Sequence, residues 1–290
     1  MQVIPQIGIQ YLEAVTSLLQ RIGQFDHTAG LLEAADLHWW WRSPRSTDSF
    51  PQLFWFDDLG RPEAAIIATD WGDGVALDPI IMPNADPDWV AHVLESGLNH
   101  AQESGLQNVD VVVDRADRVV QEVLRRHGFT TKEDEKHDVV LACLTITDRP
   151  PVSSLRDDYR LCNRLSTSQR PHHMITRNGP ELEVRLRQSW LYRPELDLLV
   201  LDTSENVAAY GLLWFDPTTA TGLVEPMRTE DDHQQRGLAR HVLTVGIDLL
   251  AATGAQRVKL CFKPANTAAR DLYLGVGFKP YKQTSIFSRG

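Results

Sequence analysis

The chain has 290 residues, 42% of them hydrophobic, and a formal net charge of −10. This length accommodates one large domain or two ordinary ones, each able to bury a core. The acidic balance, without any run of Lys and Arg, disfavours a surface that follows nucleic-acid phosphates and favours a small or cationic partner.

The N-terminal segment lacks the cationic start and long apolar core of a signal peptide, and no window approaches about eighteen apolar residues in a row. These features predict a soluble, cytoplasmic protein without a membrane partner. The triple Trp39-Trp40-Trp41 is more typical of core or interface packing than of a ligand cage. Cys143, Cys162 and Cys261 are widely spaced in apolar, strand-like runs, which predicts reduced core thiols and neither disulfides nor a metal cluster.

The two halves of the chain resemble each other. Residues 88–129 align without gaps on residues 237–278, at a spacing of 149 residues. The identical pairs include His92 with His241, Gly97 with Gly246, Gly105 with Gly254, Gly128 with Gly277, and Phe129 with Phe278. Upstream, Leu77-Asp78-Pro79 resembles Val224-Glu225-Pro226. We interpret this as an internal duplication, the alternative being two α/β units with similar local patterns.

Residues 148–156 contain two prolines, two serines and several charges, a composition typical of a linker. We therefore predict two tandem α/β domains with mixed sheets, at residues 1–147 and 157–290. The segment after Phe278 has room for one strand and doubtful room for a final hairpin.

The sequence of the second half predicts a regular succession of strands and helices. It begins with a strand over 157–165 and an irregular helical region over 169–190, broken at Asn178-Gly179-Pro180. Strands are expected at 196–202, 207–214, 221–229 and 258–262. A long amphipathic helix runs from about Gly237 to Gly254, and a short helix begins at Asn266.

The turn that precedes the long helix reads Gln234-Gln235-Arg236-Gly237. A helix that starts at Gly237 directs unpaired N–H groups and the positive end of its dipole forward, and both favour a phosphate. Glycine permits close approach of the phosphate to the backbone, and Arg236 and Arg240 add positive charge. Alone, this signal is weak, because many helices begin near a glycine.

The context strengthens the signal. Gln234, Gly237 and Ala239 match the pattern (Q/R)-x-x-G-x-(G/A), and residues 266–278 match N-x-x-A-x-x-L-Y-x-x-x-G-F at every fixed position. With a strand and a helix correctly placed between them, the second half resembles the GNAT superfamily of acyl-CoA-dependent N-acyltransferases. The resemblance covers residues 157–288 well and residues 1–147 only in outline.

The resemblance implies a cofactor site and a splayed sheet beside it. Acetyl-CoA would be the co-substrate, and the site needs no metal. The roles implied are pyrophosphate binding by the loop, cofactor contact by Asn266, and backbone contacts to the pantetheine arm from the preceding strand. The residues are Gln234, Gln235, Arg236, Gly237, Leu238, Ala239 and Arg240 in the loop, Asn266, and Met227, Arg228 and Thr229 in the strand.

The resemblance also implies direct attack of an amine on the thioester. Tyr273 stands where the family's phenol protonates the departing thiolate. Because an alkylammonium with a pKa near ~10.4 is almost wholly protonated at pH 7, a base or a water chain is needed, and Glu225 is the first candidate. The alternatives are a core aromatic at Tyr273 and a solvated strand residue at Glu225. We expect His172-His173 to be an exposed loop pair and not a metal site.

The first copy lacks the pyrophosphate loop. Gln234–Ala239 fall on Ala85-Asp86-Pro87-Asp88-Trp89-Val90, where two carboxylates, a proline and a bulky ring all oppose a phosphate. Tyr273 falls on Leu124 and Asn266 on Asp117. The first copy is thus predicted to be degenerate, with a role in closing the substrate cleft, in forming a homodimer, or in binding another ligand.

These observations predict an N-acetyltransferase that acts on a primary amine of a small molecule, with its active site in the second half. One alternative is a regulatory protein that senses acyl-CoA without turnover. A narrower alternative is a mycothiol-synthase-like enzyme, since mycothiol synthase is a tandem protein of this superfamily, although no residue here indicates that substrate.

Overall fold

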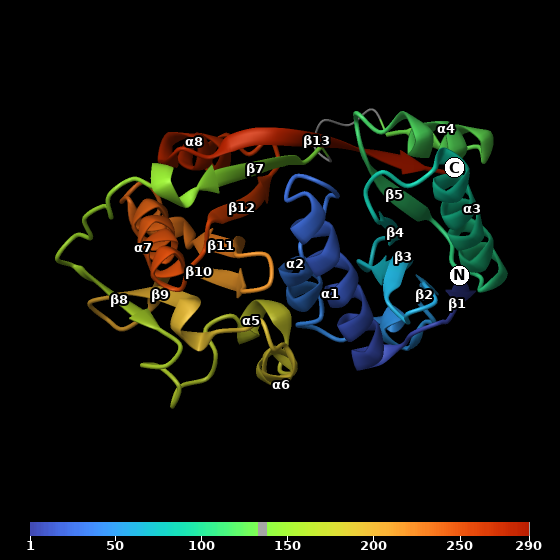
Figure 1. Ribbon diagram of the computed structural model, residues 1–290. Coiled ribbons are helices and arrows are strands. Elements are labelled where there is room, and N and C mark those ends of the chain that lie inside the picture. The colour runs from blue at the N-terminus through green and yellow to red at the C-terminus, as the bar shows by residue number, and fades with distance from the viewer. Residues whose placement is uncertain (133–137, 290) are drawn as a thin grey trace.

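One 13-stranded sheet connects the two halves of the chain in the computed structural model, which describes residues 1–132 and 138–289 (Figure 1). The strand order is β1-β2-β3-β4-β5-β13-β7-β12-β11-β10-β9-β8, and β6 pairs with β13 outside this path. Both sheet types are present, because β4–β5 and β11–β12 are parallel while the other pairs are antiparallel. The predicted mixed α/β fold class is confirmed.

The elements follow the order expected from the sequence. The first half contains β1 (Gln2–Val3), α1 (Gly8–Phe25), α2 (Ala34–Trp40), β2 (Leu53–Phe56), β3 (Pro62–Asp70), β4 (Val75–Ile81), α3 (Pro87–Glu103), β5 (Val109–Asp114), α4 (Arg118–Arg126), β6 (Thr130–Thr131) and β7 (Val140–Thr145). The second half contains β8 (Tyr159–Asn163), α5 (Ile175–Asn178), α6 (Leu182–Gln188), β9 (Asp197–Asp202), β10 (Val207–Asp216), β11 (Thr221–Thr229), α7 (Leu238–Ala252), β12 (Arg257–Phe262), α8 (Thr267–Val276) and β13 (Lys279–Ser288). Short 3-10 turns lie at Ser46–Ser49, Ile146–Asp148, Pro194–Leu196 and Asp231–His233.

The two halves repeat one topology. In each, three antiparallel strands are followed by a long helix and a strand parallel to the third: β2-β3-β4-α3-β5 and β9-β10-β11-α7-β12. The glycines paired by the 149-residue spacing have equivalent positions. A Cβ at Gly97 would collide with Ile66 of β3, and a Cβ at Gly246 with Leu213 of β10. Both helices therefore need glycine to approach the sheet closely.

Each half lends a strand to the sheet of the other. β7 lies between β12 and β13, with Leu144 opposite Val258, and β13 continues across to β5, with Phe287 opposite Val111 (Figure 1). Residues 149–156 of the predicted linker contain no helix or strand, but the hydrogen bonding of the sheet does not divide there. The domain limits at 147 and 157 stay a prediction about the folding units.

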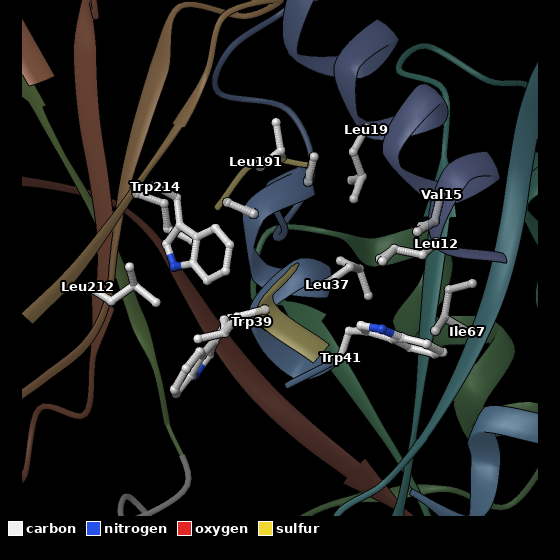
Figure 2. Close-up of a cluster of buried hydrophobic side chains, with 14 of the residues drawn as sticks. Leu12, Val15, Leu19, Leu37, Trp39, Trp41, Ile67, Leu191, Leu212 and Trp214 are labelled. Atoms are coloured by element: carbon white, nitrogen blue, oxygen red, sulfur yellow. The ribbon is translucent and has the colours of Figure 1, made fainter. Parts of the chain in front are cut away.

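A shared apolar core joins the halves. Helices α1 and α2 lie between the first and second halves of the sheet (Figure 1). Figure 2 shows Leu37 and Trp41 of the first half in the same cluster as Leu212 and Trp214 of the second. Trp39 and Trp41 are buried there, as expected for packing residues. Among the described residues, none of the helices combines the length and hydrophobicity needed to span a bilayer.

Candidate functional site

The loop before α7 has a backbone suited to an anion. Its φ angles are positive at Gln235 (58°) and Gly237 (80°), and α7 begins at Leu238. A Cβ on Gly237 would have open space, so the left-handed backbone is what favours glycine here. Within the described residues, no side chain caps this helix start. The first N–H groups of α7 therefore keep their hydrogen-bonding capacity for a phosphate at the positive end of the dipole.

The loop side chains are held by the protein around them. Arg236 donates to the Tyr159 hydroxyl at 2.6 Å and to the Asp232 carbonyl at 2.8 Å, and Arg240 donates to the Gly275 carbonyl at 3.3 Å. The Leu238 side chain is buried in the core of the second half, so only its backbone faces the loop. Positive charge thus stands beside the helix start while the backbone supplies the cradle.

Strands β11 and β12 separate next to this loop. They pair only from Thr221 to Leu223, opposite Arg257 to Lys259. Met227, Arg228 and Thr229 still pair with β10 on one side, but their other edge has no strand partner within the described residues. An unpaired edge can hydrogen-bond an extended amide-containing arm, as in β-strand addition. The splayed strands therefore fit the pantetheine role assigned to these residues.

Asn266 and Tyr273 lie on the far side of the splay. The Asn266 side chain accepts from the Ala269 backbone N–H at 3.1 Å and so caps α8. Tyr273 is buried on the same helix, with its ring 6.0 Å from that of Phe262. Burial, with smaller contributions from Cys261 and Glu225, raises the pKa of Tyr273 to about 12. The phenol therefore stays protonated at ordinary pH and can donate a proton.

Glu225 faces a second carboxyl group from the other half of the chain. Asp36 of α2 and Glu225 of β11 are hydrogen-bonded, and burial raises the pKa of both, that of Asp36 well above its usual range. Asp36 therefore keeps its proton and donates to Glu225, whose carboxylate also lies near the Arg42 cation. No sequence pattern indicated Asp36, because only the packing of α2 against β11 brings it here.

A cavity of about 520 Å³ lies between the halves and ends at this carboxyl pair. Its lining at the second half includes Glu225, Leu260 and Cys261, and at the first half the residues around the ends of β4 and β5. A volume of this size holds a small organic molecule. A small molecule bound in this cavity would therefore lie between Glu225 on one side and the splayed strands on the other.

The three cysteines are free thiols, as predicted, but only Cys162 is a core residue. Cys143 is half-buried, and Cys261 is exposed to the cavity, which corrects its predicted core position. The Cys261 side chain is nevertheless surrounded by protein, and this burial raises the pKa of its thiol. Successive side chains of β12 point to opposite faces of the sheet, and the face that carries Cys261 borders the cavity instead of the core. The apolar pattern of the sequence did not reveal this difference.

The first copy has no comparable loop. Helix α3 begins with Pro87, and the Asp86 side chain accepts from the Asp88 N–H at 2.8 Å, so a carboxylate occupies the helix start. Asp117 caps α4 as Asn266 caps α8, and Leu124, fully buried, stands in place of Tyr273. The first copy keeps the scaffold and has lost the donors for a pyrophosphate.

The prediction that His172 and His173 form an exposed loop pair was wrong. Both side chains are buried, since the loop folds back under β9. His172 Nε2 lies 2.8 Å from Asp197 Oδ2, which also accepts from the Tyr192 hydroxyl at 2.8 Å. His172, His173 and Asp197 have ligand atoms close enough together to hold a metal ion. The expectation that the site needs no metal stays a prediction.

The second half of the chain is similar in sequence to a known protein family. Residues 153–278 match the model of the Acetyltransferase (GNAT) family. A segment of 101 residues, 34% of this chain, is 35% identical to a mycothiol acetyltransferase of Beutenbergia cavernae. A second, of 123 residues and 42% of the chain, is 29% identical to a mycothiol acetyltransferase of Clavibacter michiganensis. These alignments span only 33% and 39% of the relatives' own length.

Solved structures resemble the whole chain. A tandem GNAT protein from the clavulanic acid biosynthesis pathway aligns over 99% of this chain and 97% of its own, with a TM-score of 0.71 and 12% identity. An N-acetyltransferase from Sphaerobacter thermophilus aligns over 99% and 95%, with a TM-score of 0.61 and 14% identity. At such identities the likeness concerns the fold. The family match assigns residues 153–278 to the GNAT acetyltransferase family, and the repeated topology and the structural likeness show that the whole chain has a tandem GNAT-type fold.

Proposed function

We propose that the protein transfers an acetyl group from acetyl-CoA to a primary amine of a small molecule, in an active site of the second half. The observation that carries this proposal is a cavity lined by the buried carboxyl pair beside two splayed strands, with the protonated phenol of Tyr273 near enough to Glu225 for that carboxylate to raise its pKa. Such a set can accept a proton from an ammonium group and return one to a leaving thiolate.

The cofactor would bind through the backbone. Its pyrophosphate would accept hydrogen bonds from N–H groups between Gln235 and Arg240, and its pantetheine arm would add to the free edge of Met227–Thr229. When bound, acetyl-CoA supplies an activated acyl group that an uncharged amine can attack. The residues of the chain then need only to position the two reactants and to move protons.

Glu225 is suited to the first proton transfer. Its carboxylate accepts a hydrogen bond from Asp36, and its raised pKa brings it closer to that of an amine, which makes it a stronger base than an exposed glutamate. Tyr273 is suited to the second, since its phenol is protonated and lies on the other side of the splay. The proton taken by Glu225 returns to solvent, and Tyr273 recovers its own from solvent.

A panel of primary amines tests the proposal by release of free CoA thiol from acetyl-CoA. We expect amine-dependent release and an N-acetylated product of equal amount, above the hydrolysis seen without amine. Acetyl-CoA binding without release for any amine would contradict an enzyme and support the sensing alternative.

Mycothiol acetyltransferase activity is a second candidate, favoured by the names of the relatives that part of the chain resembles. Mycothiol in its unacetylated form therefore belongs in the same panel. Preferential turnover of that amine would support this narrower function.

A further inference from the structure

The cavity extends into the first half by a route that repeats the cofactor cleft of the second. Strands β4 and β5 pair only from Val75 to Leu77, opposite Val109 to Val111, and then separate, as β11 and β12 do. The cavity enters between them and reaches Pro87 at the start of α3. The space that in the second half would admit acetyl-CoA is thus, in the first half, continuous with the space in front of Glu225.

The walls of this first-half cleft are mainly apolar. They include Pro79, Ile81, Val90, Val112 and Val120. An apolar wall favours methylene groups, because their burial removes apolar surface from water. It disfavours a polyanion such as a pyrophosphate, in agreement with the carboxylate at the start of α3.

Asp78 also lines this cleft. Its side chain is 7% exposed, and its Oδ2 atom is buried without a hydrogen-bond partner among the described residues. Burial raises the pKa of Asp78 to about 7. A buried carboxyl group without a partner costs free energy, and such groups are commonly ones that bind a ligand.

The other charged groups on the lining have partners of their own. Lys259 forms an ion pair with Glu33, and Lys282 forms one with Asp114. No cation of the described residues lies within ion-pair distance of Asp78. A cation that fits this carboxylate must therefore come from a ligand.

We propose that the first-half cleft is an acceptor subsite that holds the far end of an elongated diamine. One amino group reacts at Glu225, the methylene chain lies against the apolar wall, and the second, an ammonium group, pairs with Asp78. The subsite deepens the proposed function and rests on it for the reacting end. It gives the degenerate copy a use, since the loss of its phosphate loop leaves a cleft that a cationic ligand can fill.

Direct binding tests this subsite without relying on turnover. Calorimetric titrations compare α,ω-diaminoalkanes of increasing length with 1-aminoalkanes of the same length, on the wild type, on Asp78→Asn and on Asp88→Asn. Asp88→Asn is the matched control, because it removes the same charge from an exposed position. We expect one diamine length to bind best, and Asp78→Asn to weaken it by about 10- to 100-fold. Monoamine binding should change by less than about threefold, and Asp88→Asn should behave as the wild type.

The outcomes separate the subsite from the proposed activity. Diamine binding that depends on Asp78, in a protein that acetylates no amine, would support the subsite and contradict the proposed function. Amine turnover together with diamine binding that Asp78→Asn leaves unchanged, or a wild type that prefers monoamines, would overturn the subsite alone. Thermal unfolding of each variant verifies that it is folded.

Discussion

Replacement of Tyr273 by phenylalanine should lower kcat by about 10²- to 10⁴-fold, the usual contribution of a general acid. The ring would keep its contacts with Phe262 and Phe278, so folding and acetyl-CoA affinity should change little. Only the hydroxyl proton would be lost. A fall in kcat without a change in cofactor affinity identifies an interaction made in the transition state.

The measurement is steady-state thiol release with the best amine of the panel, together with an acetyl-CoA titration. Tyr210→Phe provides the control, since Tyr210 is another buried tyrosine of the second half, and its ring packs against His173. Turnover of Tyr273→Phe within about twofold of the wild type is below even the weak end of the expected range. That result would mean that water or another residue protonates the thiolate.

Replacement of Glu225 by glutamine should also lower kcat/KM by about 10²- to 10⁴-fold near neutral pH, since the amide cannot accept the ammonium proton. The pKa of Glu225 is raised by burial, so in the wild type the active carboxylate is lost as the pH falls through that raised value. The wild-type profile should therefore decline on its acid side at a higher pH than an exposed glutamate would give.

The pH dependence of kcat/KM distinguishes a role of Glu225 as the base from a role in packing alone. Glu225→Gln should lack the acid decline due to this carboxyl group, and its deficit should shrink at low pH, where the wild type is protonated as well. It should also shrink at high pH, where the amine deprotonates without help. Glu103→Gln, at an exposed position of α3, is the control and should keep the wild-type profile. A uniform loss over the whole pH range would contradict the role of Glu225 as the base.

Much of the fold was predictable because its signals are local. The helix from Gly237 and the strand over 221–229 follow from periodicity and turn residues, and the structure has them within one or two residues of the predicted limits. The 149-residue spacing also predicted which glycines would be equivalent, because the same close approach of helix and sheet recurs at Gly97 and Gly246.

The exchange of strands was not predictable from these signals. β7 has the apolar pattern of an ordinary strand and β13 a largely polar one, and neither pattern indicates which half of the sheet the strand joins. Pairing partners over such sequence separations are decided by the packing of the whole molecule. The same reason hid the buried environment of His172, whose neighbours in sequence are polar.

The carboxyl groups that line the cavity also differ in how far the sequence predicts them. Glu225 was a candidate because it precedes a proline on the strand that enters the cofactor cleft, and Asp78 appeared only as its weak echo in the first half. Asp36 had no signal at all, since its role depends on contact between residues almost two hundred positions apart. Sequence patterns thus pointed to the predicted cofactor loop, and only tertiary packing pointed to the proposed acceptor side.

Calorimetric titration with acetyl-CoA tests most directly whether the second half alone carries the cofactor site. The account predicts one site per chain in the wild type, unchanged affinity in Asp88→Asn, and binding weakened by at least about 100-fold in Gly237→Asp. Aspartate at that position would disfavour the left-handed backbone and place a negative charge at the helix start. Two equivalent sites per chain, or binding that survives Gly237→Asp but is lost in Asp88→Asn, would contradict it.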